Sequence, residues 1–190
     1  MSATVVSTFL GTGSAYAIHR YKTRLQKVQA GLIWSPLFIP DILMGISLVI
    51  LFVVLNIKLG LFTIFLAHTT FCISYVTLVI LSRLQNFDFS VIEAARDLGA
   101  NGFQVTRKVF IPMIAPAIIA AALLAFTLSI DDFVVTYFVT GPGSGTLPIY
   151  IYGMIKYGST PIINALSCLI LLVTFITVFL TQYFSGDYKS

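Results

Sequence analysis

A polar stretch at residues 85–112 carries the residue types and spacing suited to binding another protein. Within it, Ser90 and Glu93 have the spacing of a capping box at a helix start, and Gly99 suits the left-handed residue that ends such a helix. Asn101 can cap a second helix. A helix–turn–helix between two apolar segments predicts a docking surface for a soluble partner, although an amphipathic loop lying on lipid fits the same pattern.

Three carboxylates stand within or at the ends of apolar segments. Asp41 follows a proline inside one segment, and Asp131 and Asp132 lie near the end of another. A charge at the bilayer centre costs about 2.5–3.5 kcal/mol on insertion scales, so each carboxylate is expected to face a cavity or a partner. A path for a cation is one interpretation; helix packing for Asp41 and a water-exposed helix end for the pair stay open. His68 fits a hydrogen bond between helices better than a ligand.

The sequence predicts no catalytic residue, no metal site and no cofactor bound by this chain. Its two histidines and two cysteines are scattered, and no nucleophile stands beside a readable base. The glycine-rich segment 141–146 lacks the lysine of a phosphate-binding loop and is interrupted by Pro142. Any energy source must therefore belong to a partner.

The composition is that of a protein embedded in a lipid bilayer. Of 190 residues, 58% are hydrophobic and only 9% are charged, and the mean hydropathy is +0.98. An ordinary soluble domain is about a quarter charged. The net charge of +4 calls for no nucleic-acid partner. Five segments are long enough to cross a membrane, at about 2–18, 32–55, 59–82, 113–135 and 161–184.

Basic residues set the expected orientation of these spans. Nine of the eleven lie on one side, in loops 19–30 and 83–112 and at the C-terminus. The positive-inside rule makes that side cytoplasmic and turns the N-terminus outward. An outward N-terminus with a short first span predicts an earlier span that is missing or separately encoded; a five-span protein with a translocated N-terminal tail is the alternative.

The polar stretch also resembles a known motif. It contains Glu93-Ala94-Ala95, then Gly99 after three residues, then Val109-x-Ile111-Pro112 after nine more. This order resembles the EAA motif of ABC importer permeases, with two conservative replacements near its end. Other parts of the chain agree: four segments, beginning at Ser35, His68, Phe126 and Phe138, and the stretch Asn164-Ala165-Leu166. They resemble spermidine/putrescine permeases of the PotC type. The similarity runs over nearly all of the chain, although members of that family usually have six spans.

The resemblance implies an all-α, polytopic membrane protein with the type I ABC importer permease (MetI-like) fold, about five spans of it in this chain. It implies a permease subunit in the bacterial inner membrane that takes up polyamines. Its partners would be an ABC ATPase dimer that binds ATP, a second permease subunit and an external polyamine-binding protein. The ATPase-coupling residues would be Glu93, Ala94, Ala95, Gly99, Ile111 and Pro112.

Two other functions fit parts of the pattern. A secondary transporter would need no ATPase, but such folds usually contain two repeated halves, and no convincing repeat is found in 190 residues. A membrane scaffold could recruit a soluble partner through 85–112, but it would have no need of Asp41, Asp131 and Asp132.

Overall fold

The computed structural model describes the chain except residues 22, 159–160, 162–163, 166–167, 170–171 and 173–190. It divides into two units, Met1–Thr146 and Leu147–Ser190, and each is described by itself. The second unit contains helix α9, Leu147–Tyr157. Most of the fifth predicted span, 161–184, lies outside the described residues.

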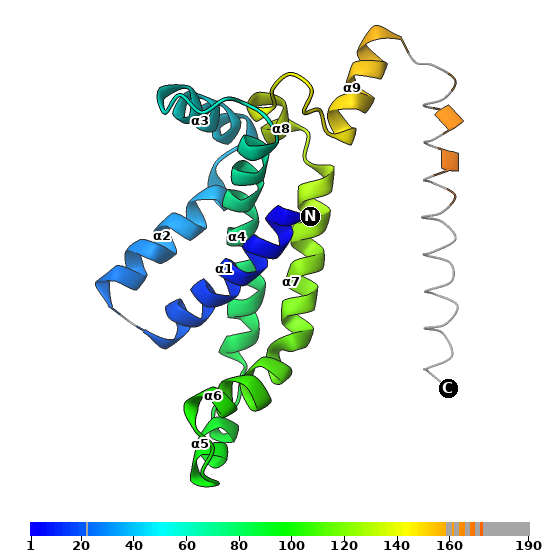
Figure 1. Ribbon diagram of the computed structural model, residues 1–190. Helices are drawn as coiled ribbons and strands as arrows, with labels where there is room; N and C mark the ends of the chain where they lie inside the picture. The colour runs from blue at the N-terminus through cyan, green and yellow to red at the C-terminus, as the bar shows by residue number, and fades with distance from the viewer. Residues whose placement is uncertain (22, 159–160, 162–163, 166–167, 170–171, 173–190) are drawn as a thin grey trace. The chain divides into compact units, whose positions relative to one another are not determined.

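The first unit is built from helices, which confirms the predicted all-α class (Figure 1). Two long helices, α4 and α7, run side by side, with α1 packed against both. Shorter helices lie at their two ends. In chain order the elements are α1 Ser2–Arg20, α2 Arg24–Phe38, α3 Asp41–Val54, α4 Leu61–Gln85, α5 Ser90–Asp97, α6 Gly102–Val105, the π-helix η1 Thr106–Phe110, α7 Ile111–Asp131 and α8 Val134–Val139.

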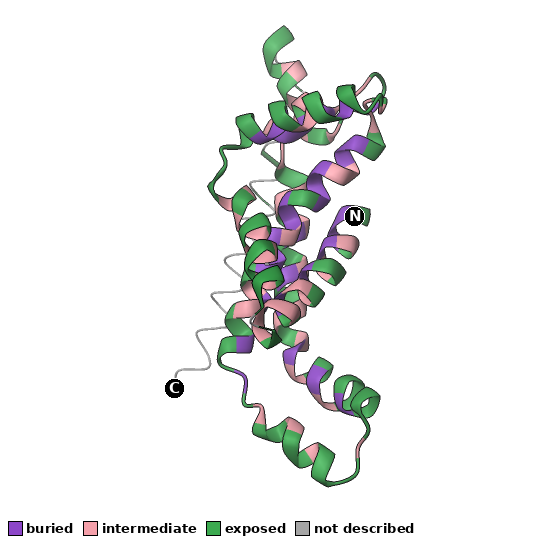
Figure 2. Ribbon diagram, turned by 90° about the vertical axis from the view of Figure 1, so that its left-hand side faces the viewer, coloured by how far each residue is buried: buried purple, intermediate pink, exposed green. Residues whose placement is uncertain are grey.

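Helix α4 supplies much of the core of this unit (Figure 2). Ala67, Cys72, Val76 and Ile80 on it are fully buried. Close approach of α1 depends on Gly11, where a Cβ atom would lie 2.6 Å from Cγ1 of Val76. Small residues commonly let membrane helices pack this closely, because lipid supplies no hydrophobic force between them.

Two of the described helices are long and apolar enough to cross a membrane: α4, and the continuous helix Gly102–Asp131. A third span is possible if α2 and α3 count as one segment, although they meet at a bend of 117°. Helix α1 is also long, but its serines and threonines lower its hydropathy, and it does not belong to this group.

The predicted second span, 32–55, is therefore two helices that break at Ile39 and Pro40. Both residues have extended backbone, and Pro40 is the N-cap of α3. Proline favours this break because it cannot donate a backbone hydrogen bond and it disfavours helical geometry in the preceding residue. Asp41 consequently occupies the first position of α3 instead of the middle of a continuous span.

The start of the fourth predicted span also differs from the sequence prediction. We expected a span at about 113–135, but α6, η1 and α7 form one helix from Gly102 to Asp131. The five-residue π-helix directly precedes Pro112. π-Helices are rare and occur mostly as single-turn bulges inside α-helices. This one contains Lys108, whose carbonyl the ring of Pro112 would meet in a regular α-helix. The polar stretch and the span are thus parts of one helix.

Candidate binding sites

Helix α5 begins differently from the predicted capping box. Phe89 is its N-cap residue, and Ser90 and Glu93 form no side-chain cap. Instead, Oδ1 of Asp88 accepts a hydrogen bond of 2.9 Å from the backbone N–H of Ser90. An aspartate commonly accepts from the N–H two residues later, which leaves Ser90 inside the helix. Hydrogen bonds from the side chain and backbone of Ser90 hold the pKa of Asp88 below its ordinary value.

The turn between α5 and α6 matches the sequence prediction. Gly99 has φ +85°, the left-handed conformation expected there. Its N–H donates to the carbonyl of Arg96, and that of Ala100 donates to Ala95, which is the Schellman arrangement. Asn101 then caps α6: its Oδ1 accepts from the N–H of Gln104 at 2.9 Å, and Gln104 Oε1 accepts from Asn101 at 3.0 Å. These local bonds give the loop a defined shape.

An aromatic cluster fixes this loop to the ends of the long helices. Phe87 contacts the rings of Phe89 and Phe110 at centroid distances of 4.8 and 5.5 Å. Tyr16 packs edge-on against Phe110 at 5.3 Å, and His19 stacks on Phe89 at 5.2 Å. The cluster joins the C-terminal end of α1 to both ends of the loop. Sequence reasoning missed it, because the pairing depends on α1 packing beside α4.

The outer side of the loop is exposed. Leu98 and Phe103 are 89% and 71% exposed, and they lie on either side of the Gly99 turn. Large apolar side chains held on a shaped polar loop are typical of a contact surface. Of the predicted coupling residues, Ala95 is half-buried and the others are exposed: Glu93, Ala94, Gly99, Ile111 and Pro112. Ile111 and Pro112 stand in the first turn of α7, past the π-helix.

The three predicted path carboxylates line one cavity at the other end of α7. Asp41 comes from the start of α3, Asp131 from the last residue of α7, and Asp132 from the junction with α8. The cavity measures about 270 Å³, and its wall includes the aromatic rings of Phe71, Tyr75 and Phe133. The structure thus brings together residues that are 90 positions apart in the sequence. The grouping could receive a cation through carboxylates and aromatic faces.

These carboxylates differ in how they are satisfied. Asp132 accepts hydrogen bonds from the backbone N–H of Thr136 at 2.8 Å and from its hydroxyl at 2.6 Å. It also accepts one of 3.3 Å from the N–H of Val135, so its carboxylate satisfies two backbone N–H groups in the first turn of α8. Asp41 and Asp131 are exposed and make no hydrogen bond or ion pair within the described residues. They are the two carboxylates left open to a ligand.

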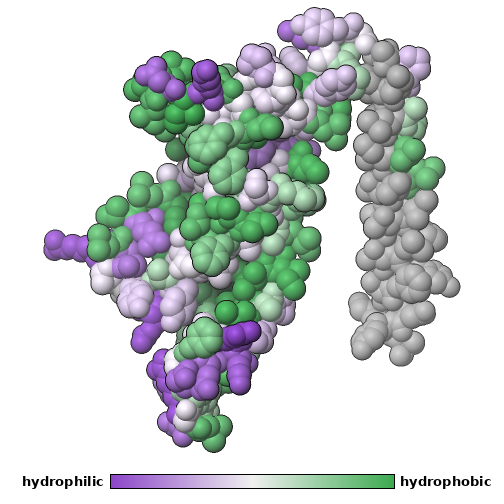
Figure 3. Space-filling model, in the orientation of Figure 1, coloured by the Kyte–Doolittle hydropathy of each residue, from purple (hydrophilic) through white to green (hydrophobic). Residues whose placement is uncertain are grey.

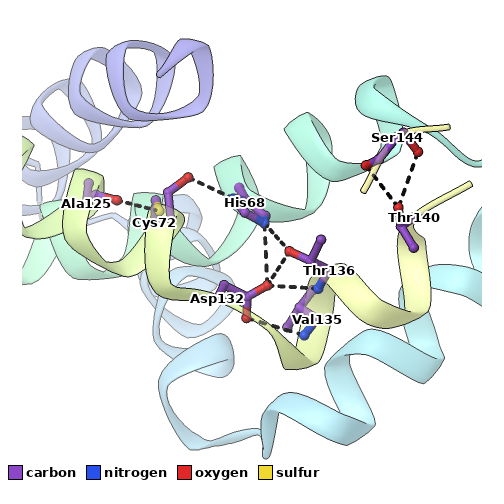
Figure 4. A network of polar contacts seen from close by, with 9 residues as sticks. His68, Cys72, Ala125, Asp132, Val135, Thr136, Thr140 and Ser144 are labelled. Carbon is purple, nitrogen blue, oxygen red and sulfur yellow. Dashed lines mark hydrogen bonds and ion pairs between the residues drawn. The ribbon is translucent and has the colours of Figure 1, made fainter. Parts of the chain in front are cut away.

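His68 on α4 connects α7 and α8 through hydrogen bonds of its two ring nitrogens (Figure 4). Its Nδ1 lies 2.7 Å from Oγ of Ser129, and its Nε2 lies 2.7 Å from Oγ1 of Thr136. Because the Thr136 hydroxyl donates to Asp132, its oxygen must accept from His68, which places a proton on Nε2. Nε2 also lies 3.4 Å from Oδ2 of Asp132. The predicted interhelical role of His68 is confirmed.

No group of three or more histidine, cysteine, aspartate or glutamate side chains able to hold a metal occurs among the described residues. The partners of His68, Ser129 and Thr136, were not predicted. A signal was present, because a buried histidine in an apolar helix requires hydroxyl or carbonyl partners. Sequence alone could not say which of the many serines and threonines supply them.

Comparison with known proteins gives consistent matches over nearly the whole chain. Residues 7–189 match the family model described as binding-protein-dependent transport system inner membrane component. The chain is 41% identical over 181 residues to the spermidine/putrescine transport system permease protein PotC of Escherichia coli K12, covering 95% of this chain and 69% of the relative. PotC of Haemophilus influenzae is also 41% identical, with coverages of 95% and 70%. The putrescine transport system permease protein PotI of Escherichia coli K12 is 44% identical, with coverages of 95% and 67%.

Replacing Thr136 with valine tests the link between His68 and Asp132. The change keeps the shape of the side chain but removes a donor to Asp132 and an acceptor for His68. We expect the free energy of unfolding to fall by about 1–3 kcal/mol. In a chain of this size that corresponds to a melting temperature lower by about 2–4 °C for each kcal/mol. The matched control is Thr127→Val, whose exposed hydroxyl bonds only the carbonyl of Leu123 in its own helix. Equal thermal unfolding of the two purified variants would contradict the assignment.

Proposed function

This chain belongs to the family of binding-protein-dependent transport system inner membrane components, and from that premise we propose that it is a permease subunit of an ATP-driven polyamine importer. As a family member it is a membrane component of a transport system. Its similar relatives are named as spermidine/putrescine and putrescine permeases, which supports a polyamine as the substrate.

The acidic cavity is the observation that carries the choice of substrate. Two carboxylates that have no partner among the described residues, and a third that is already hydrogen-bonded, line this cavity together with aromatic side chains. A polyamine at neutral pH is a flexible chain with several ammonium groups joined by methylene segments. Ammonium groups bind carboxylates and aromatic faces, and the methylene segments pack against apolar side chains. Asp41 and Asp131 are assigned to the ammonium groups.

Asp132 has a supporting role in this proposal. Its charge is compensated by donors from Thr136 and Val135, so it does not need the substrate for its own stability. Helix α7 ends at Asp131 and α8 begins at Val134. By accepting hydrogen bonds from the first turn of α8, Asp132 holds the start of α8 against the end of α7. The position of Asp131 relative to Asp41 therefore depends on a junction that is satisfied even when the cavity is empty.

The loop at 85–112 is proposed to be the contact with a partner ATPase. Support comes from its exposed apolar side chains and from local bonds that shape it without any partner present. Glu93 would supply a polar contact, and the small side chains of Ala94 and Ala95 would allow close approach. Gly99 would provide the turn between the two helices. ATP would be bound and hydrolysed by the partner, with no cofactor in this chain.

The continuous helix Gly102–Asp131 suggests how the two sites communicate. One end belongs to the loop and the other carries Asp131 in the cavity. A helix transmits displacement along its axis because its hydrogen bonds resist stretching. Movement of the loop by the ATPase pair would shift α7 against α3 and α4, and would alternately open the path to the two sides of the membrane.

The proposed location is the bacterial inner membrane, with the 85–112 loop and the C-terminus in the cytoplasm. The basic loops support this orientation through the positive-inside rule. A second permease subunit and an external polyamine-binding protein complete the proposed assembly. Neither a membrane scaffold nor a secondary transporter accounts for a match over residues 7–189 to this transport family.

Asparagine at Asp41 or Asp131 should weaken polyamine uptake through binding. Charge-assisted hydrogen bonds contribute about 1.5–3 kcal/mol, so we expect KM for spermidine to rise by about tenfold or more while Vmax changes less. Uptake of labelled spermidine by proteoliposomes containing the whole importer measures both constants. The matched controls, Asp41→Glu and Asp131→Glu, keep the charge and should retain much of the affinity. Asparagine variants with the wild-type KM would contradict the substrate assignment.

Aspartate at Leu98 should separate the chain from its ATPase without unfolding it. The side chain is 89% exposed, so the free protein loses little, whereas a buried interface contact of this kind is worth about 2 kcal/mol or more. Copurification from membranes should recover at least about tenfold less ATPase. Leu25→Asp is the control, because Leu25 is 78% exposed on α2, outside the loop. Equal recovery from the two variants would remove the loop from the contact.

A further inference from the structure

A long groove on the first unit is separate from the acidic cavity and shares no lining residue with it. It measures about 1180 Å³ and runs between α1 and α7 down to the loop. Val5 and Phe9 on α1 and Ile118 and Ala122 on α7 line its apolar part. Figure 3 shows hydrophobic side chains over the long helices and hydrophilic ones gathered around α5 and α6 at the lower end.

Two hydroxyls on the α1 side of the groove donate within the helix, those of Thr8 and Thr12. Thr8 and Thr12 each donate to the carbonyl four residues earlier, at 2.7 Å. Their hydroxyl protons are consequently already used, and their methyl groups add to an apolar wall. Such a wall suits a hydrocarbon chain better than water or a charged substrate.

The end of the groove beside the loop has a different chemistry. Arg20 from α1 and Arg96 from α5 both line it, together with Tyr16 and the His19 ring. Glu93 is the one acidic residue in the lining. Neither arginine forms an ion pair in the part of the chain that the structure describes. The groove therefore joins an apolar channel to a basic, aromatic end at the level expected for lipid headgroups.

We propose that this groove binds an anionic phospholipid, with its phosphate at Arg20 and Arg96 and an acyl chain between α1 and α7. Basic pockets between membrane helices on the cytoplasmic side bind anionic headgroups, and the proposed orientation places this end there. The Tyr16 ring lies at the boundary between chain and headgroup. An apolar helix in the same place would leave both guanidinium groups facing side chains that carry no charge.

A bound lipid would also touch the docking loop. Arg96 and Glu93 belong to α5, and Gly102 begins the helix that continues into α7. The headgroup would thus hold α1 and α5 together by its negative charge, beside the stacked His19 and Phe89 rings. The shape of the loop would depend on the lipid composition of the membrane, whatever substrate the importer carries.

Photo-crosslinking of the chain, coexpressed with its partner subunits in phosphatidylcholine nanodiscs, tests this site. The probes are phosphatidylglycerol and phosphatidylcholine carrying the same diazirine acyl chain, and mass spectrometry maps the labelled peptides. We expect phosphatidylglycerol to label α1 and α7 peptides about fivefold more than phosphatidylcholine. Arg20→Gln and Arg96→Gln should each reduce that preference, whereas Arg24→Gln and Arg107→Gln, outside the groove, should not.

Filling the groove gives a second, independent variant. Gly13 lines the groove and a Cβ atom there meets nothing within 4 Å, so we expect the side chain of Gly13→Leu to enter the groove and reduce labelling by both lipids. Gly31→Leu is the matched control, since Gly31 also has open space and does not line the groove. Equal labelling of the groove by the two lipids would overturn the proposal. It would also be overturned if neither lipid labelled the groove, which is the result expected where a partner helix covers it. Loss of the preference in excess inorganic phosphate would assign the basic end to free phosphate instead.

Discussion

A carboxylate held among apolar helices must find hydrogen-bond donors, and the rest of the structure depends on how Asp132 finds them. Thr136 and Val135 donate to it from the first turn of α8, and His68 on α4 donates to Thr136. This chain of donors ties α4, α7 and α8 together where α7 ends. Because these bonds form within the protein, Asp132 is satisfied and α8 is held in place. Asp41 and Asp131 are left open in the cavity beside it.

The two candidate sites lie at opposite ends of one helix. The loop is shaped by local bonds, namely the Gly99 turn and the Asn101 cap, and is fixed by aromatic contacts to α1. The cavity is shaped by the junction at His68. Between them the helix from Gly102 to Asp131 is unbroken, and a π turn directly precedes Pro112. Binding at either end can thus alter the position of the same element.

Local features were predictable from the sequence to the extent that they depend on neighbouring residues. Gly99 and Asn101 behave as expected because turn and cap preferences act over a few positions. Ser90 does not, because Asp88 competes for the same backbone donor from just outside the motif. The break at Pro40 agrees with the local preference of proline, but no local pattern gives its bend of 117°. The grouping of Asp41 with Asp131, and the partners of His68, required the packing of α3, α4 and α7, which no local pattern encodes.

The proposed communication between loop and cavity requires that α7 connect them as a rigid element. Distances between paired spin labels measure this directly in the assembled importer, with Cys168 replaced by serine to remove the exposed native thiol. Labels at Phe103 and Ile130 stand at the two ends of the helix, about 40 Å apart at 1.5 Å per residue, and a label at Ile42 reports on α3. On ATP binding, we expect an unchanged distance between 103 and 130 and a changed distance between 130 and 42. A helix that shortens or bends between 103 and 130, while 130 and 42 stay fixed, would contradict it.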